Sequence, residues 1–164
     1  MAETDGRVIK VLIGQVALSR APNRLEAVLG SCIGLVLYQR PVAVAGMAHI
    51  LLPDSAGRDA GKLVGKYANQ AVPCLLQAML RYGAKRADIR AKFAGGSRMF
   101  TRSLDYRSQD VGTGNIEAVR AALHAHGLDA GACEVGGDAG RKVTFDIASN
   151  QLVIERFDGR RQVL

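Results

Sequence analysis

Residues 29–53, with the sequence LGSCIGLVLYQRPVAVAGMAHILLP, have the pattern of a β-hairpin. Two apolar runs flank a short turn that contains Pro41, and they cover 33–38 and 42–52. Cys32 precedes the centre of this turn by eight residues and His49 follows it by nine. Antiparallel pairing therefore brings Cys32 and His49 to the same open end, either as direct neighbours or across a bulge.

A thiol beside an imidazole is a nucleophile and base arrangement. The imidazole of His49 can accept the thiol proton of Cys32, form an ion pair with the thiolate and later protonate a leaving group. Gly30 and Gly34 let the backbone bend near the sulfur and leave N–H groups unobstructed there, where an oxyanion can accept hydrogen bonds. The spacing alone also fits a structural interpretation, because buried cysteines and single histidines commonly complete an apolar core.

Short motifs in and around the hairpin resemble those of the CheD family of chemoreceptor glutamine deamidases. Within the hairpin the similarity rests on LGSC at 29–32, GMAH at 46–49 and LLP at 51–53. Further blocks follow in the family order and extend over most of the chain, namely KYA at 66–68, GA at 83–84, FAGGSRMF at 93–100, GNIE at 114–117 and GGDAGRKV at 136–143.

This resemblance implies an enzyme that hydrolyses glutamine side chains on chemotaxis receptors to glutamate and so contributes to chemotactic adaptation. It assigns Cys32 as the nucleophile and His49 as its base, and we expect backbone N–H groups around Gly30 and Ser31 to stabilise the oxyanion. The expected partners are cytoplasmic receptor helices, as substrate, and a phosphatase of the CheC type. The resemblance implies neither a cofactor nor a metal.

At position 26 the sequence departs from the family pattern. CheD proteins resemble one another in having a threonine six residues before the cysteine, where its hydroxyl is thought to orient the histidine, and this chain has Glu26 there. A carboxylate bonded to the second nitrogen of His49 would fix the tautomer and stabilise the imidazolium. The alternative is a Glu26 side chain that faces solvent.

The composition fits a single domain over residues 1–164. A chain of 164 residues can bury a core without cross-links, and 48% hydrophobic residues with no Trp and four Phe indicate an aliphatic core. The three cysteines, Cys32, Cys74 and Cys133, have no short paired spacing, which argues against a disulfide framework or a zinc site. Because the N-terminus does not resemble a leader and no apolar stretch reaches membrane-spanning length, we expect a cytoplasmic protein.

The formal net charge of +7 favours acidic partners and is the main support for nucleic-acid binding. The basic residues are scattered from Arg7 to Arg161, and no nucleic-acid motif or pair of stacking aromatics accompanies them. We therefore prefer an ordinary solvated basic surface without nucleic-acid binding.

The remaining sequence predicts an α+β fold. Helical spacing of apolar residues indicates two helices, at 67–82 and 116–126, each followed by glycine. Apolar runs or alternation indicate further strands at 88–94, 142–147 and 152–154. We expect a single-domain layered fold with a largely antiparallel β-sheet core, covered on one side by the two main helices.

The segment after the strand at 88–94 has two interpretations. Gly95, Gly96 and Ser97 favour a tight turn. The alternative is a groove lined by the following residues up to Phe100, because glycines permit close approach of another backbone.

Three other functions stay open. One is a non-catalytic adaptor that binds receptor helices or a CheC-type phosphatase, for which Cys32 would matter little. Another is a nucleic-acid-binding domain, whose affinity would fall steeply with salt because of counterion release. The third is a different cysteine hydrolase acting on esters or peptide bonds, which product analysis distinguishes from a deamidase.

Overall fold

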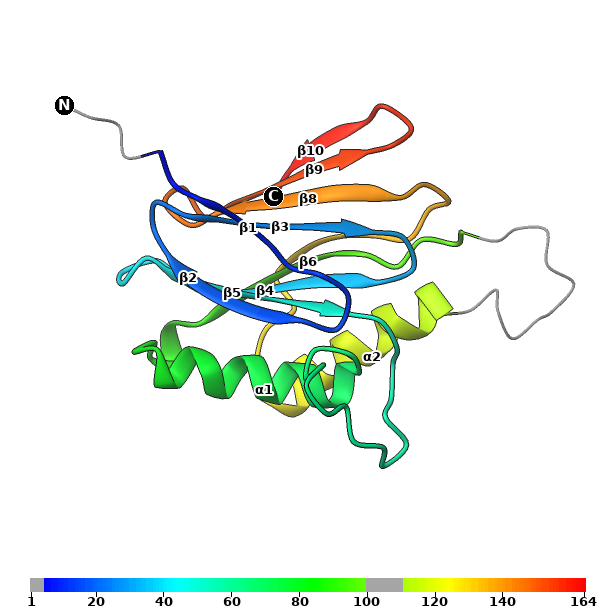
Figure 1. Cartoon of the computed structure of the whole chain (residues 1–164), viewed down its shortest axis with the longest axis horizontal. Helices are drawn as coiled ribbons and strands as arrows, with labels where there is room; N and C mark the ends of the chain where they lie inside the picture. The colour runs from blue at the N-terminus through cyan, green and yellow to red at the C-terminus, as the bar shows by residue number, and fades with distance from the viewer. Residues whose placement is uncertain (1–4, 100–110) are drawn as a thin grey trace, which may run out of the picture.

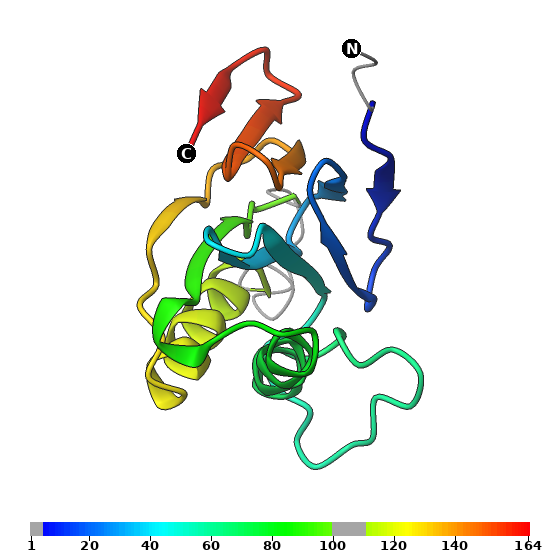
Figure 2. The same cartoon turned by 90° about the vertical axis from the view of Figure 1, so that its left-hand side faces the viewer.

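The computed structural model describes residues 5–99 and 111–164. In this part of the chain, two five-stranded β-sheets lie one above the other, and two helices cover the outer face of one of them (Figure 1). A view turned by 90° shows the helices again below both sheets (Figure 2). The sheet in the middle of the three layers is called the central sheet here, and the other is the outer sheet.

The elements divide between the layers as follows. The central sheet contains β2 (Val16–Arg20), β4 (Ile33–Gln39), β5 (Val44–Ile50), β6 (Arg90–Gly95) and β7 (Ala132–Val135), in the order β2-β5-β4-β6-β7. The outer sheet contains β1 (Val8–Lys10), β3 (Arg24–Leu29), β8 (Arg141–Asp146), β9 (Gln151–Arg156) and β10 (Arg161–Val163), in the order β1-β3-β8-β9-β10. The helices are α1 (Ala68–Arg81) and α2 (Val111–Ala125), with a short 3-10 turn at Arg86–Asp88.

The predicted hairpin is confirmed. β4 and β5 pair antiparallel over their whole lengths, and every residue of both strands is buried. Leu35 and Ala48 pack on the helix side of the sheet, whereas Val36 and Met47 pack toward the outer sheet. Because both faces are covered, the two strands are continuous apolar runs instead of alternating polar and apolar residues.

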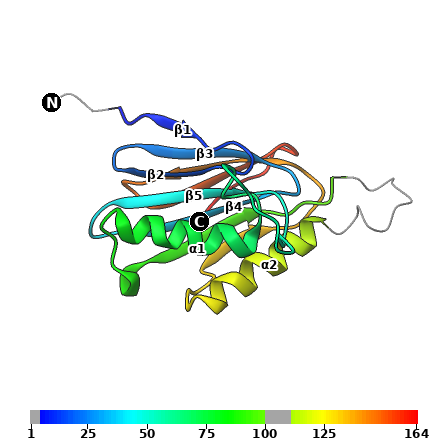
Figure 3. The same cartoon turned by 60° about the horizontal axis from the view of Figure 1, so that its bottom comes forward.

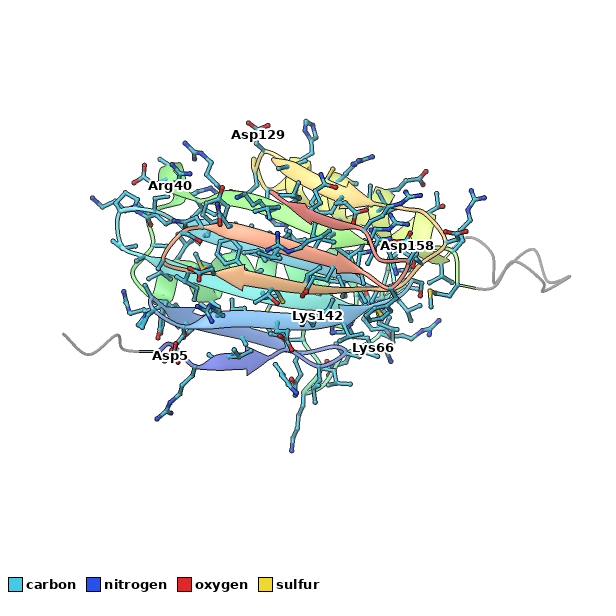
Figure 4. All side chains as sticks on the ribbon, turned by 90° about the horizontal axis from the view of Figure 1, so that it is seen from above. Asp5, Arg40, Lys66, Asp129, Lys142 and Asp158 are labelled. Carbon is cyan, nitrogen blue, oxygen red and sulfur yellow. The ribbon has the colours of Figure 1, made fainter. Side chains whose placement is uncertain are left out.

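The outer sheet has one covered and one exposed face. Along β8, Val143 and Phe145 are fully buried against the central sheet, while the alternate residues Lys142, Thr144 and Asp146 are half-buried. Figure 4 views this exposed face from above and shows Lys142 projecting from it. The alternation predicted for this strand from its sequence is therefore confirmed.

The two helices lie side by side under the central sheet (Figure 3). α1 is amphipathic and buries a stripe that includes Val72, Leu75 and Met79 against β5. Pro73 lies inside α1. Within the described residues, the structure contains no helix that is long and apolar enough to cross a membrane.

α2 begins at Val111, five residues before the expected start at 116. Gly112 and Gly114 disfavour a helix by propensity, so the sequence pattern placed the start after them. The structure explains Gly112, because a Cβ there would lie only 2.6 Å from the Gly96 carbonyl oxygen. The first turn of α2 thus packs directly on the backbone that follows β6.

The expected fold class is confirmed, since the described residues form a layered α+β structure with helices on one side. Six of the eight strand pairs found in them are antiparallel. The sequence did not predict the two parallel pairs, β1 with β3 and β6 with β7. Each requires a crossover, through β2 in the other sheet and through α2 respectively.

Candidate active site

Cys32 lies in the short connection between β3 and β4, at the open end of the hairpin. Its side chain is 6% exposed and belongs to the core between the two sheets. In the β4–β5 register, Gly34 is opposite His49, so Cys32 is a diagonal neighbour of His49 across the hairpin. His49 follows Met47 by two residues and therefore faces the same core.

The connection after β6 holds the Cys32 turn through the backbone. Ser97 donates two hydrogen bonds to the Gly30 carbonyl oxygen, from its N–H at 3.0 Å and from its hydroxyl at 2.8 Å. The Gly96 N–H donates to the Cys32 carbonyl oxygen at 2.9 Å. A Cβ at Gly95 would lie 2.1 Å from that oxygen, so glycine is required for this approach. Another backbone therefore approaches these glycines closely. The groove expected up to Phe100 stays a prediction, because Phe100 lies outside the described residues.

Asn115, on α2, binds the carbonyl group of Ser31, which lies between those of Gly30 and Cys32. Its side chain is fully buried, and its Nδ2 donates to the carbonyl oxygens of Ser31 at 2.9 Å and Leu51 at 3.0 Å. Both partners can only accept, which assigns the amide nitrogen to the side that faces them. Three successive carbonyl groups of the turn are thus anchored by the β6–α2 region.

The N–H groups of Ser31 and Cys32 are directed away from these anchors. In a trans peptide the N–H points opposite to the preceding C=O, and the peptides here are trans. No described residue accepts a hydrogen bond from either N–H. Two unengaged donors beside a thiol are the groups from which an oxyanion hole is built.

His49, at the penultimate position of β5, is 3% exposed. Its Nδ1 lies 2.8 Å from the carbonyl oxygen of Val11. Since a carbonyl oxygen only accepts, Nδ1 bears the proton and donates, and Nε2 is the unprotonated nitrogen. Nε2 is buried and has no hydrogen-bond partner in residues 5–99 and 111–164. The ring is therefore oriented with its basic nitrogen unengaged, as a general base requires.

Burial disfavours the charged forms of both Cys32 and His49. Burial raises the pKa of the Cys32 thiol. Burial also lowers the pKa of His49 and outweighs the opposite effect of its hydrogen bond to Val11. Both groups are consequently uncharged near neutral pH, and the described residues show no hydrogen bond between them.

A pocket of about 280 Å³ lies between the segment that follows β1 and the middle of β3. His49 and Glu26 both line it. Three apolar side chains that line it are more than half exposed, namely Leu12, Ile13 and Val28. His49 thus lines a pocket with an apolar border, and Cys32 is not among the described residues that line it.

Glu26 points to the outer side of β3, because its two neighbours in the strand face the core. The pKa of Lys142 is raised, first by the hydrogen bond and charge of Glu155 and then by the charge of Glu26, so Glu26 lies near that ammonium. No hydrogen bond joins Glu26 to His49 in the described part of the chain, and the Val11 carbonyl engages Nδ1. The role of Glu26 as a third catalytic group stays a prediction.

The other two cysteines lie outside this site. Cys74 is half-buried on α1, and Cys133, on β7, packs against the core on the helix side of the central sheet. Among the described residues there is no group of three side chains that could hold a metal ion.

Sequence reasoning missed Val11, Ser97 and Asn115 as parts of the site. Each acts through a contact between segments that are far apart in the chain. Asn115 lies in the GNIE block and Ser97 in the FAGGSRMF block, both of which resemble the family, but the pattern assigned neither residue a role in the site.

Fold and site together define a layered α+β protein with a buried thiol and imidazole at the end of a hairpin. The family model described as CheD chemotactic sensory transduction matches residues 51–156. A probable chemoreceptor glutamine deamidase CheD from Methanococcus vannielii is 38% identical over 149 residues, which cover 91% of this chain and 95% of that protein. The chemoreceptor glutamine deamidase CheD of Halalkalibacterium halodurans is 39% identical over 149 residues, covering 90% and 92% respectively. This chain belongs to the CheD family.

Among solved structures, the Bacillus licheniformis hypothetical protein YfiH is similar with a TM-score of 0.47 and 18% identity, over 79% of this chain and 58% of that one. The residues matched by the family model include Ser97 and Asn115. Cys32 and His49 precede the residues matched by the family model.

Proposed function

We propose that this protein hydrolyses glutamine side chains of chemotaxis receptors to glutamate, with Cys32 as nucleophile and His49 as base. The observation that most supports this is the tautomer of His49, whose Nδ1 is engaged by Val11 while Nε2 is free in the core that holds the thiol. The relatives, which are named chemoreceptor glutamine deamidases, support the substrate class.

The reaction begins when the Cys32 sulfur attacks the carbonyl carbon of the glutamine side chain. The thiol proton passes to Nε2 of His49, and the new oxyanion accepts hydrogen bonds from the N–H groups of Ser31 and Cys32. As the C–N bond breaks, Nε2 returns the proton to the leaving nitrogen, and ammonia departs. Cys32 is left as a thioester of the substrate side chain.

Water completes the reaction. Nε2 of His49 takes a proton from water as its oxygen adds to the thioester carbon, and the same N–H groups stabilise the second oxyanion. When the C–S bond breaks, the proton returns from His49 to the Cys32 sulfur. Glutamine and water thus give glutamate and ammonia, and the receptor gains a negative charge.

The neutral resting pair agrees with this sequence of proton transfers. A thiol with a raised pKa transfers its proton only when a substrate carbonyl is present to receive the sulfur electrons. Catalytic hydrogen bonds that are long in a free enzyme commonly tighten in the substrate complex. Glu26 lines the same pocket as His49, but Val11 already engages Nδ1 of His49, so we propose Cys32 and His49 alone as the catalytic pair.

The apolar border of the pocket supports a protein substrate. Leu12, Ile13 and Val28 give a surface on which a helix with apolar side chains can dock, and Lys10 adds a positive charge. We propose the cytoplasmic helices of receptors as this partner and the cytoplasm as the site of action. A phosphatase of the CheC type is a second proposed partner.

The test is incubation with a cytoplasmic receptor fragment, followed by peptide mass spectrometry for conversion of glutamine to glutamate. The wild type is expected to convert defined glutamines, and Cys32→Ala is expected to convert none. Receptor binding by the wild type without any conversion would contradict the proposal and assign the chain to the non-catalytic adaptors.

A further inference from the structure

Asn115 is a polar residue on the buried stripe of α2. It lies one turn before Val119, and the stripe continues with Leu123, so the helical pattern calls for an apolar side chain at 115. Burial of an amide is unfavourable unless it is hydrogen-bonded. Here Nδ2 is satisfied, while Oδ1 is buried with no partner in the described residues. Within the described part of the chain, one buried polar atom of the amide is thus left unpaired at a position where the helical pattern favours an apolar side chain.

The position of α2 leaves this amide little freedom. A Cβ at Gly112 would lie 2.6 Å from the Gly96 carbonyl oxygen, and a Cβ at Gly96 would lie 2.5 Å from Ile116. The helix thus contacts the backbone after β6 directly on both sides of Asn115. A side chain carried by such a closely packed element is held in one place.

The two carbonyl groups that Asn115 binds belong to the two halves of the site. Ser31 immediately precedes the nucleophile, and Leu51 follows His49 by two residues. One donor group therefore links the Cys32 turn to the end of β5. The hydrogen bond to Ser31 also fixes the plane of the Ser31–Cys32 peptide, and with it the direction of the Cys32 N–H.

We propose that Asn115 is a positioning residue for the reaction, which directs the Cys32 N–H toward the developing oxyanion by holding the Ser31 carbonyl. Asn115 itself touches neither substrate nor sulfur. This inference rests on the proposed thiol mechanism, because the oxyanion forms only when Cys32 attacks an acyl group.

The inference predicts that loss of Asn115 affects two reactions of the Cys32 thiol differently. Attack on an amide or ester passes through a tetrahedral oxyanion, which needs the directed N–H. Alkylation by iodoacetamide is a displacement at a saturated carbon, and no oxyanion forms at the attacked atom. Loss of Asn115 therefore slows acyl transfer at Cys32 and leaves alkylation of Cys32 unchanged, whereas local unfolding of the buried turn would speed alkylation.

The experiment compares Asn115→Leu with Val119→Ala. Asn115→Leu keeps the size of the side chain and removes the donor, and Val119→Ala loosens the same helix without touching the Cys32 turn. Four quantities are measured: kcat and KM for deamidation of a receptor fragment, the p-nitrophenolate burst from p-nitrophenyl acetate, the alkylation rate of the Cys32 peptide by mass spectrometry, and the melting temperature. Asn115→Ala serves as a second variant if the leucine variant does not fold.

For Asn115→Leu we expect kcat and the burst rate to fall about 10²-fold, the loss typical of one oxyanion donor, with KM and the alkylation rate within about threefold of wild type. Val119→Ala is expected to keep kcat. The inference is overturned if kcat falls no more than in Val119→Ala, or if alkylation accelerates as kcat falls.

Failure of the proposed function gives a different result. If the wild type converts no glutamine but gives a burst with the ester, the proposed function is wrong. The fall of the burst rate in Asn115→Leu then tests the role of Asn115 by itself. If the wild type shows neither conversion nor a burst, both the proposed function and this inference are wrong.

Discussion

Nδ1 of His49 donates a hydrogen bond of 2.8 Å to the carbonyl oxygen of Val11, a residue 38 positions earlier in the chain. This contact joins β5 to the segment that follows β1, across the two sheets. Nδ1 carries a proton both in the neutral ring and in the doubly protonated ring, so Nε2 is the basic nitrogen of His49. Since Nε2 is buried without a described partner, protonation there is unfavourable in the folded protein.

We therefore predict a pH-dependent stability that comes from His49. Burial lowers its pKa in the folded state, whereas the unfolded chain has a pKa of about 6.5. As the pH falls below about 6.5, the unfolded chain binds the proton more readily, so the free energy of unfolding decreases down to the lower folded pKa. Above pH 6.5 or so this contribution is fully present.

Urea unfolding at a series of pH values between about 5 and 8 measures this slope. His49→Gln is expected to remove it, because glutamine does not titrate. His124→Gln, which changes an exposed histidine, is the matched control and should keep the slope. Equal slopes for wild type and His49→Gln would show that His49 is not the group responsible.

Among the three cysteines, only Cys32 is expected to matter for activity. Cys32→Ala should reduce deamidation to background, because alanine has no atom that can form the thioester. Cys133→Ala and Cys74→Ala should keep the wild-type rate, since both residues lie outside the inter-sheet core. Full activity of Cys32→Ala in the receptor assay would contradict the mechanism.

Arg141 is expected to be essential for stability. Its guanidinium is fully buried, pairs with Glu134 and binds the Gly136 carbonyl oxygen, and it lies opposite Leu29, just before the Cys32 turn. Arg141→Met leaves the Glu134 carboxylate with fewer partners, and breaking a buried ion pair in this way typically costs about 3 kcal/mol or more.

Urea unfolding measures the loss in Arg141→Met. The control is Lys142→Met, which removes an exposed charge paired with Glu155 and should leave stability nearly unchanged, because exposed ion pairs contribute little. Equal decreases in the free energy of unfolding for Arg141→Met and Lys142→Met would contradict a special role of Arg141.

The hairpin and the placement of Cys32 and His49 in it were predictable because the information is local. Two apolar runs and one turn fix the pairing, and the side-chain period of two then places Cys32 and His49 on one face. The same reasoning worked for α1, which has the spacing of a helix and ends before Gly83.

The remaining parts of the site depend on contacts between distant segments. Asn115 is 84 residues from Ser31, and neither periodicity nor spacing records such a contact. Gly112 and Gly114 lower helix propensity, so the expected helix started at 116 and did not include Asn115. Tertiary packing determines that start, since Gly112 must pass close to Gly96.

The last prediction concerns Glu26, which replaces the family threonine. We expect Glu26→Gln to keep kcat within about threefold of wild type, because Nδ1 of His49 is already engaged by Val11, and the carboxylate lies near Lys142 on the outer side of β3. Steady-state deamidation of a receptor fragment measures this, with Lys142→Met as a control for the local charge. A loss of about a hundredfold in Glu26→Gln alone would instead assign Glu26 to the catalytic set, since positioned acid and base groups contribute on the order of 10² to 10⁴.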